Sequence, residues 1–376
     1  MADLKTNIIG LDREQLKSLL IEFNLIKPSE KFRIKQIWHW LYYHGVTDID
    51  HMTSLSIRFR EGLKKFFTLQ RPKLNKEQYS SDGTIKWLIK LADGNLVETV
   101  YIPEENRGTL CVSSQVGCTL NCKFCHTGTQ KLVKNLSTEE IVSQLMIARD
   151  RLSDWPTNEN RKISNIVFMG MGEPLYNYDS VKKSVQIFSD QEGIKLSTKR
   201  ITLSTSGIVP QILEWGKEVD TVLAISLHAT NDELRNELVP INRKYPIAVL
   251  FDSIRNYLDG LSDNRSVTFE YTMLKGVNDS DELARELSTL AKTIRCKINL
   301  IPFNPFPGTR YEVSSRNRIY AFQRILLNDG HVVTVRKTRG DDIDAACGQL
   351  AGQVADKTKR SARYIQINDV SEQVAH

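Results

Sequence analysis

Hydrophobic and polar residues follow one another with different periods in different parts of the chain. Over the first 66 residues, apolar positions recur every three or four residues, which is the period of an amphipathic helix. From residue 79 to 103 the period is two, and a turn at 93–95 separates two alternating runs, which predicts a β-hairpin. We expect helices at 11–26, 32–43 and 54–66, and hairpin strands at 84–90 and 96–102.

From residue 109 onward, short apolar runs alternate with helical periodicity. Repeated β/α units indicate a parallel sheet covered by helices. Six units and a seventh strand are fewer than a closed barrel needs. The predicted fold class is therefore α/β, an open, partial TIM-like (β/α)6 barrel. We expect strands at 109–114, 165–169, 200–204, 221–226, 267–273, 297–303 and 331–336. We expect helices at 137–152, 178–192, 208–217, 246–260, 280–294 and 315–328.

These patterns divide the chain into four segments. We expect an N-terminal helical domain at 1–76, a β-hairpin extension at 77–103, the barrel core at 104–340, and a C-terminal loop with a basic tail at 341–376. No apolar run approaches the roughly 18 residues of a membrane span, and the N-terminus lacks the apolar stretch of a signal peptide. We therefore expect a cytoplasmic protein, in which cysteines stay reduced unless they bind metal or carry out redox chemistry.

The positive charge of the chain is concentrated near the N-terminus. The net charge is +6, yet residues 27–76 hold 11 Lys and Arg against 4 Asp and Glu, so the remaining chain is slightly acidic. A localised basic excess is typical of a surface that binds nucleic-acid phosphates. The apolar residues between these cations have a simpler interpretation as the core of the helical domain. They are Ile34, Ile37, Trp38 and Leu41.

Three cysteines lie close together in the loop after the first barrel strand. Cys118, Cys122 and Cys125 present thiolates, which are soft ligands for iron–sulfur clusters, zinc or copper(I). Three thiolates on a cubane cluster leave one iron open for substrate chemistry. Small and polar residues follow the other strands, at the end of a barrel where active sites lie. They occur in 169–174, 203–207, 225–228 and 302–307.

Two other metal sites fit parts of the same loop. Cys122-Lys-Phe-Cys125-His126 matches the haem c attachment pattern, but an export signal is lacking and Cys118 would be unexplained. A structural zinc site could use His126 as its fourth ligand, although such sites normally combine two separated ligand pairs. We favour the cluster over both alternatives.

The other cysteines are more ambiguous. Cys347 lies in the acidic, glycine-flanked segment 340–350, which could reach the cluster loop from the same end of the barrel. Cys111 and Cys296 lie on predicted strands, where a lone cysteine is more often buried packing. Glu98 lies within a hairpin strand, where a glutamate more often faces solvent.

The motifs together resemble a known family. The Cys118–Cys125 loop is similar to the signature of radical S-adenosylmethionine (SAM) enzymes. The stretches MGMGEP (169–174), SLH (226–228), PFNPFPG (302–308) and GDDIDAACGQL (340–350) resemble the RlmN/Cfr family of RNA methyltransferases, in particular its adenosine-C2 branch. The resemblance covers essentially the whole chain, including the helical domain and the hairpin.

The resemblance implies a dual role for SAM. One molecule would methylate Cys347, and a second would be cleaved to a 5′-deoxyadenosyl radical that activates the resulting S-methylcysteine for addition to C2 of adenosine. Cys111 would release the product through a transient disulfide, and Glu98 would accept a proton. The [4Fe-4S] ligands would be Cys118, Cys122 and Cys125. SAM would contact Gly172, Glu173, Ser204, Ser226, Leu227, His228 and Asn304.

The implied partners are 23S rRNA, tRNA beside the anticodon, and an electron donor such as a flavodoxin system, with no membrane and a monomeric chain. The sibling C8 methyltransferase is the nearest alternative, but Glu173-Pro174 favours the C2 branch, because the sibling typically has Ala after that Glu. An alternative of another class is a non-enzymatic RNA-binding protein stabilised by a metal. By the same resemblance, His126 has no assigned role and Cys296 is packing.

Overall fold

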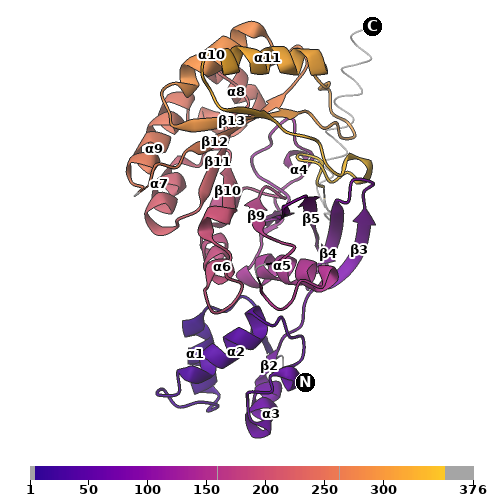
Figure 1. Cartoon of the computed structure of the whole chain (residues 1–376), viewed down its shortest axis with the longest axis vertical. Coiled ribbons are helices and arrows are strands. Elements are labelled where there is room, and N and C mark those ends of the chain that lie inside the picture. Colours follow the sequence, from indigo (N-terminus) through magenta and orange to yellow (C-terminus); the bar gives the residue numbers. More distant parts are fainter. Residues whose placement is uncertain (1–4, 159, 262, 352–376) are drawn as a thin grey trace.

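The computed structural model describes residues 5–158, 160–261 and 263–351 and contains a small helical part below a larger α/β part (Figure 1). The helical part comprises α1 (Arg13–Glu22), α2 (Phe32–Tyr42) and α3 (Ile57–Phe66), with β1 (Thr6–Asn7) paired in parallel to β2 (Phe67–Thr68). Asp12 caps α1 through a reciprocal capping box with Gln15. The predicted core residues are buried in this part, as expected: Ile34, Ile37, Trp38 and Leu41.

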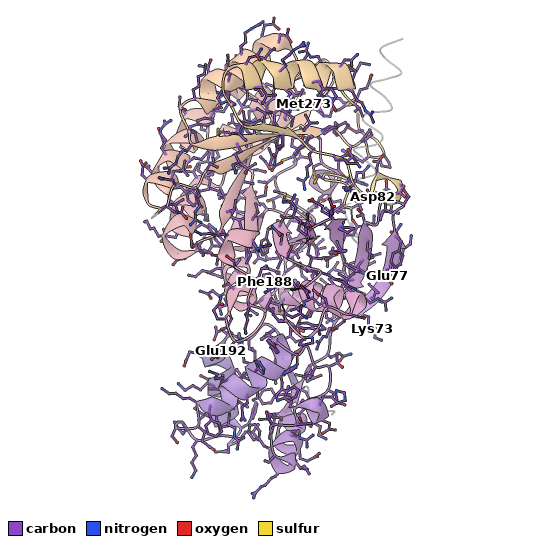
Figure 2. The ribbon with its side chains drawn as sticks, viewed as in Figure 1. Lys73, Glu77, Asp82, Phe188, Glu192 and Met273 are labelled. Atoms are coloured by element: carbon purple, nitrogen blue, oxygen red, sulfur yellow. The ribbon has the colours of Figure 1, made fainter. Side chains whose placement is uncertain are left out.

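Charged contacts join the helical part to the rest. Glu192, labelled in Figure 2, pairs with Arg13 and Lys35. Arg71 is largely buried and pairs with Asp150, with 3.1 Å between Nε and Oδ2. Its guanidinium also donates to the carbonyls of residues 45, 46 and 69, so the linker before the sheet is fixed in place.

One ten-stranded sheet forms the centre of the larger part. Its order is β14-β13-β12-β11-β10-β9-β6-β5-β4-β3. The seven strands from β6 to β14 are parallel to their neighbours, and β3 to β6 are antiparallel. No pairing joins β14 to β3 within the described chain, so the open, partial barrel is confirmed. The parallel strands are β6 (Arg107–Cys111), β9 (Asn165–Phe168), β10 (Ile201–Thr205), β11 (Val222–Ser226), β12 (Val267–Met273), β13 (Cys296–Pro302) and β14 (Val333–Val335).

Helices cover the outside of the parallel strands (Figure 1). The predicted helices are present within a few residues, and Ser137 and Glu140 form the capping box expected from the sequence. A short helix, α8 (Asp232–Leu238), was not predicted. The others are α5 (Thr138–Leu152), α6 (Tyr178–Ser189), α7 (Val209–Glu218), α9 (Ile247–Asp259), α10 (Asp281–Ala291) and α11 (Arg316–Asn328). None of the described helices is long and apolar enough to cross a membrane.

The hairpin extension is larger than predicted. The strands β4 (Ile85–Lys90) and β5 (Leu96–Glu104) are joined by β3 (Lys73–Tyr79), which the sequence pattern missed. Lys73, Glu77 and Asp82 mark this outer edge in Figure 2. β3 carries mostly polar residues because it is an edge strand, so it lacks the apolar alternation of a buried strand. Because β5 pairs with β6, the extension continues the barrel sheet and positions residues beside its open side.

Candidate functional site

The loop that bears the three cysteines closes one end of the barrel. It follows β7 (Gln115–Val116), where Gly117 has a φ of +75° and a Cβ there would lie 2.1 Å from the Lys131 carbonyl oxygen. The loop and the ends of β9, β10 and β11 enclose a cavity of about 150 Å³. Eight predicted site residues line this cofactor cavity: Cys118, Cys122, Cys125, Gly172, Glu173, Ser204, Ser226 and His228.

The three thiols form one electrostatic group. Burial raises the pKa of the Cys122 thiol well above its usual value, and its neighbours Cys118 and Cys125 raise it further. Binding to iron would offset this cost, because the metal binds the thiolate form. No three Cys, His, Asp or Glu side chains of the described chain converge as the ligands of one ion would. In a cubane each thiolate binds a different iron, so three thiols on one loop are sufficient to hold a cluster.

His126 has a structural environment. Its ring stacks on Phe306, with centroids 5.1 Å apart, and its backbone N–H donates to the carbonyl of Gly348 at 2.7 Å. Burial lowers the pKa of the imidazole. Cys296 lies outside both cavities, and burial raises the pKa of its thiol to about 12, as expected for a packing residue.

Glu173 is held rigidly beside the cysteine loop. Its carboxylate accepts hydrogen bonds from the backbone N–H groups of Leu175 (3.1 Å) and Ser206 (2.9 Å). Burial raises the pKa of Glu173 to about 7. The preceding Gly172 has a φ of +96°, and a Cβ there would lie 2.4 Å from the Gln115 side chain. Only glycine therefore brings the backbone so close to the cavity.

Of the residues after β11, His228 lines the cofactor cavity with its side chain, whereas Leu227 does not. His228 is buried, and its Nδ1 accepts the backbone N–H of Thr272 at 3.0 Å. Burial lowers the pKa of His228 to about 3, so the ring is neutral near pH 7. Phe124 from the cysteine loop packs on it, with ring centroids 4.3 Å apart. The Leu227 side chain is fully buried in the core, so only its backbone is available to a ligand.

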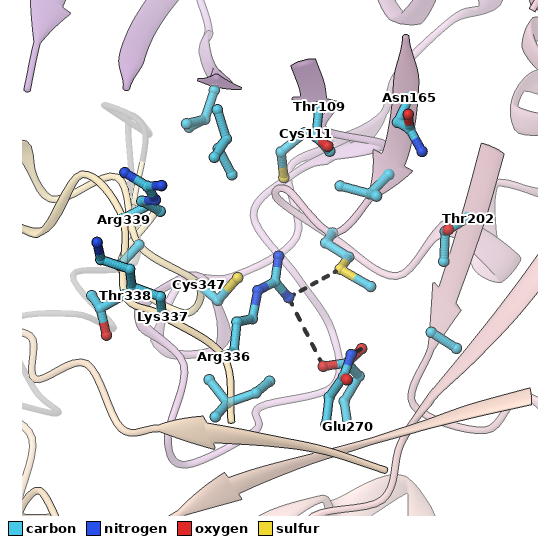
Figure 3. Close-up of a pocket in the computed structure, with 18 of the residues that line it drawn as sticks. Thr109, Cys111, Asn165, Thr202, Glu270, Arg336, Lys337, Thr338, Arg339 and Cys347 are labelled. Atoms are coloured by element: carbon cyan, nitrogen blue, oxygen red, sulfur yellow. Dashed lines mark hydrogen bonds and ion pairs between the residues drawn. The ribbon is translucent and has the colours of Figure 1, made fainter. Parts of the chain in front are cut away.

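A second, larger cavity of about 610 Å³ adjoins the first inside the open barrel. Cys111, from the end of β6, and Cys347 both face this thiol cavity (Figure 3). Cys347 lines both cavities, and both thiols are free. Burial raises the pKa of Cys111 to about 12. The nearby Cys347 also raises this pKa, whereas the positive charge of Arg336 lowers it. Two cysteines 236 positions apart in the sequence therefore meet at one site.

Arg336 and Glu270 are candidate site residues that were not predicted from the sequence. The Arg336 guanidinium lies beside Cys347, contacts the Met169 sulfur at 3.7 Å and pairs with Glu270 at 3.9 Å (Figure 3). Cys347 raises the pKa of Arg336. Glu270 is buried and accepts a hydrogen bond from Asn299, but its Oε2 has no hydrogen-bond partner. The only sequence signal was that each charge lies on or directly after a barrel strand.

Two predicted residues face elsewhere than expected. Asn304 lines the thiol cavity, where its Nδ2 donates to the Cys347 carbonyl at 3.0 Å. Glu98 lines neither cavity. Its Oε1 pairs with Lys86 at 3.3 Å, and its Oε2 accepts the backbone N–H of Ala351 at 3.0 Å. Glu98 is thus buried and paired, in contrast to the usual strand glutamate.

The basic segment presents two kinds of cation. Lys35 pairs with Glu192, and Lys64 pairs with Asp50 and Glu61. A second group is exposed and forms no ion pair with other described residues: Lys31, Arg58, Lys65, Lys73 and Lys76. The cations at positions 357–363 lie outside the described residues.

Family models match two parts of the chain. The Radical SAM superfamily matches residues 112–287, which contain the cysteine loop and four of the seven parallel strands, β9 to β12. The ribosomal RNA large subunit methyltransferase N-terminal domain matches residues 6–69, which form the helical part.

Full-length relatives give the same assignment. The chain is 54% identical over 367 residues to the dual-specificity RNA methyltransferase RlmN of Bradyrhizobium diazoefficiens, covering 96% of this chain and 91% of that one. It is 54% identical over 364 residues to the RlmN of Sinorhizobium fredii, covering 93% and 88%. A solved radical SAM methyltransferase from Sphaerobacter thermophilus superposes with a TM-score of 0.85 at 41% identity, covering 92% and 99%. The chain therefore belongs to the RlmN family of dual-specificity RNA methyltransferases, radical SAM enzymes whose cofactors are a [4Fe-4S] cluster and SAM.

Proposed function

We propose that this enzyme methylates C2 of adenosine in 23S rRNA and in tRNA, with Cys347 as the methyl carrier and Cys111 as the thiol that releases the product. The observation that carries the proposal is the cavity shared by the two free thiols, which adjoins the cofactor cavity at Cys347. The relatives are dual-specificity RNA methyltransferases, which supports RNA as the substrate.

The cofactor cavity has the donors that the cofactors require. Cys118, Cys122 and Cys125 would hold the [4Fe-4S] cluster. Gly172, Glu173, Ser204 and the backbone of 226–228 would orient SAM, and Asn304 would approach it from the adjoining thiol cavity. When bound at the cluster, SAM supplies the methyl group and the radical that activates it. Glu173 would pair with the SAM ammonium, because its carboxylate already points into the cavity.

The thiols would act in sequence. The Cys347 thiolate accepts a methyl group and becomes a thioether. The methyl carbon would give up one hydrogen atom to the radical that SAM supplies and would then bond to C2 of adenine, and C2 would give up its hydrogen as a proton and an electron. Glu98 would accept the proton, and the cluster held by Cys118, Cys122 and Cys125 would take up the electron. The Cys111 thiolate then attacks the Cys347 sulfur, an S–S bond forms, the S–C bond breaks, and the released carbon takes a proton to complete the methyl group.

Anaerobic reconstitution with iron, sulfide, SAM and a reductant, followed by nucleoside mass analysis of treated rRNA and tRNA, tests the proposal. The expected product is 2-methyladenosine. If 8-methyladenosine were the sole product, the chain would instead have the activity of the sibling C8 enzymes. RNA binding without any turnover would support the non-enzymatic alternative.

The same activity suggests where the enzyme acts, which protein reduces it and which residues contact RNA. We place the enzyme in the cytoplasm, as a monomer that receives electrons from a donor such as a flavodoxin system. The described residues Lys31, Arg58, Lys65, Lys73 and Lys76 would contact RNA phosphates, because they are exposed and lack internal ion pairs.

A further inference from the structure

One buried ion pair holds both ends of the segment that carries Cys347. At the start of the segment, Lys86 Nζ donates to the carbonyl of Asp344 at 3.0 Å. At its end, Glu98 Oε2 accepts the backbone N–H of Ala351 at 3.0 Å. Lys86 Nζ and Glu98 Oε1 are themselves 3.3 Å apart. Lys86 on β4 and Glu98 on β5 are diagonal neighbours, since Lys86 is paired with Val100 and Glu98 with Leu88. One ion pair on the sheet therefore binds both residue 344 and residue 351.

The burial of this pair requires an explanation. The side chains of Lys86 and Glu98 are only 6% and 10% exposed. Taking two charges out of water costs several kcal/mol, and apolar residues of similar size often stabilise a fold equally well or better. Stability of the barrel is therefore a weak reason for the pair. Its distinctive property is that each charge also binds one end of the Cys347 segment.

The middle of the segment is held by neutral contacts. Asn304 donates to the Cys347 carbonyl, the backbone N–H of His126 donates to the Gly348 carbonyl, and Thr127 donates to the Leu350 carbonyl. In this arrangement Cys347 borders the cofactor cavity and is not bonded to Cys111. Arg336 lies beside the Cys347 sulfur (Figure 3). A bond between the two thiols therefore requires the segment to shift.

We propose that Lys86 is a positioning residue and that Lys86 and Glu98 form a clasp on segment 344–351, which loosens when Glu98 takes up a proton. The loosening of the clasp rests on the proposed function, in which Glu98 receives the proton that leaves C2 of adenine. The neutral carboxyl no longer balances the Lys86 ammonium, so the grip on both ends weakens. This happens when Cys347 must next approach Cys111. His126 also faces the pair, and burial lowers the pKa of its imidazole.

The clasp can be tested on the full-length holoenzyme without SAM or RNA. Hydrogen exchange of the amides of 344–351 and iodoacetamide labelling of Cys347, mapped by mass spectrometry, both report opening of the segment. We expect Lys86→Met and Glu98→Gln each to accelerate both rates about fivefold or more. Lys86→Arg keeps a cation and should stay near the wild-type rates. The control Lys90→Met removes an exposed lysine from the same strand and should change neither rate.

The double variant Lys86→Met/Glu98→Gln separates the clasp from general damage. Lys86→Met alone leaves the Glu98 carboxylate buried without its partner and could therefore fold poorly. The double variant removes both charges and avoids this problem. Since both residues act on one clasp, the double variant should open the segment no more than either single variant. Exchange of the β12 amides should stay slow in every variant, which distinguishes local opening from loss of fold.

The clasp would be refuted if exchange and labelling in the double variant matched wild type. It would also be refuted if the β12 amides accelerated together with the segment. Neither result depends on methylation, so both leave the proposed function standing. Conversely, full methylation by Cys347→Ala would overturn the proposed function without changing the exchange measurements.

Discussion

The cysteine-loop end of the cofactor cavity and the boundary that this cavity shares with the thiol cavity are built in opposite ways. Beside the cysteine loop, Glu173 accepts two backbone N–H groups and His228 accepts one. Glu270 and Arg336 line both cavities; Glu270 Oε2 has no hydrogen-bond partner among the described residues, and the Arg336 guanidinium makes long contacts with Met169 and Glu270. The cysteine-loop end is organised in advance for a constant cofactor, whereas the shared boundary has charges left for groups that change during the reaction.

The largest expected effect concerns Cys347. Cys347→Ala removes the only thiol that borders both cavities among the described residues, so methylation of RNA should be abolished. Nucleoside mass analysis after anaerobic turnover measures this directly. Cys296→Ala, a cysteine outside both cavities, is the matched control and should retain activity. Residual 2-methyladenosine from Cys347→Ala would mean that the thiol cavity does not carry the methyl group.

Loss of Cys111 should stop the reaction later. Cys111→Ala leaves Cys347 able to accept a methyl group and bond to the base, but nothing breaks the S–C bond. We expect a covalent protein–RNA adduct, visible as a shifted band on denaturing gels and sensitive to ribonuclease. If the variant turned over freely with no adduct, Cys111 would belong to the packing of β6.

Glu173 tests whether the cofactor cavity depends on its preformed hydrogen bonds. Gln in its place offers one acceptor oxygen for two backbone donors, and an unsatisfied buried donor costs about 1–3 kcal/mol. We expect SAM binding about tenfold weaker by equilibrium dialysis, together with a lower melting temperature. The exposed Glu105→Gln variant should resemble wild type in both measurements. Unchanged SAM binding would place Glu173 outside the cofactor site.

The same carboxyl should leave a signature in the pH dependence of stability. Burial raises the pKa of Glu173 from 4.5 to about 7, so the folded chain binds an extra proton between these values. The stability that this proton contributes is fully present below pH 4.5 and is lost as pH rises through about 7. Without cofactors, wild type should therefore lose stability relative to Glu173→Gln across this window. Parallel denaturation curves at each pH would contradict the assignment.

A smaller effect, on RNA affinity, is expected at the basic surface. Some lysines there form ion pairs within the protein and others do not. Lys31→Glu and Lys65→Glu change exposed cations that lack internal ion pairs, whereas Lys35 pairs with Glu192. Each lost phosphate contact should weaken RNA binding and reduce the slope of log affinity against log salt by about 0.7–0.9. Lys35→Gln should change the slope less. Equal slopes for all three variants would remove this surface from the RNA interface.

The sequence alone determined much of this protein. The barrel strands, the six longer barrel helices, the cysteine loop and the polar strand ends were predicted, because each depends on local periodicity or spacing. Parallel strands then bring their carboxyl ends together whatever the details of packing. Family resemblance added Cys111, Cys347 and Glu98, which pattern alone did not distinguish from packing or solvent-facing residues.

Only the tertiary structure decided how charges meet across the sheet. Lys86 reaches Asp344 across 258 positions, and Glu98 reaches Ala351 across 253. Arg336 lies between Met169, which directly follows β9, and Glu270 on β12. The polar strand β3 is recognised only by its pairing with β4. Such contacts carry no local periodic signal, since each requires two distant segments to be packed first. The thiols were visible in the sequence, but the clasp that holds one of them was a property of the fold.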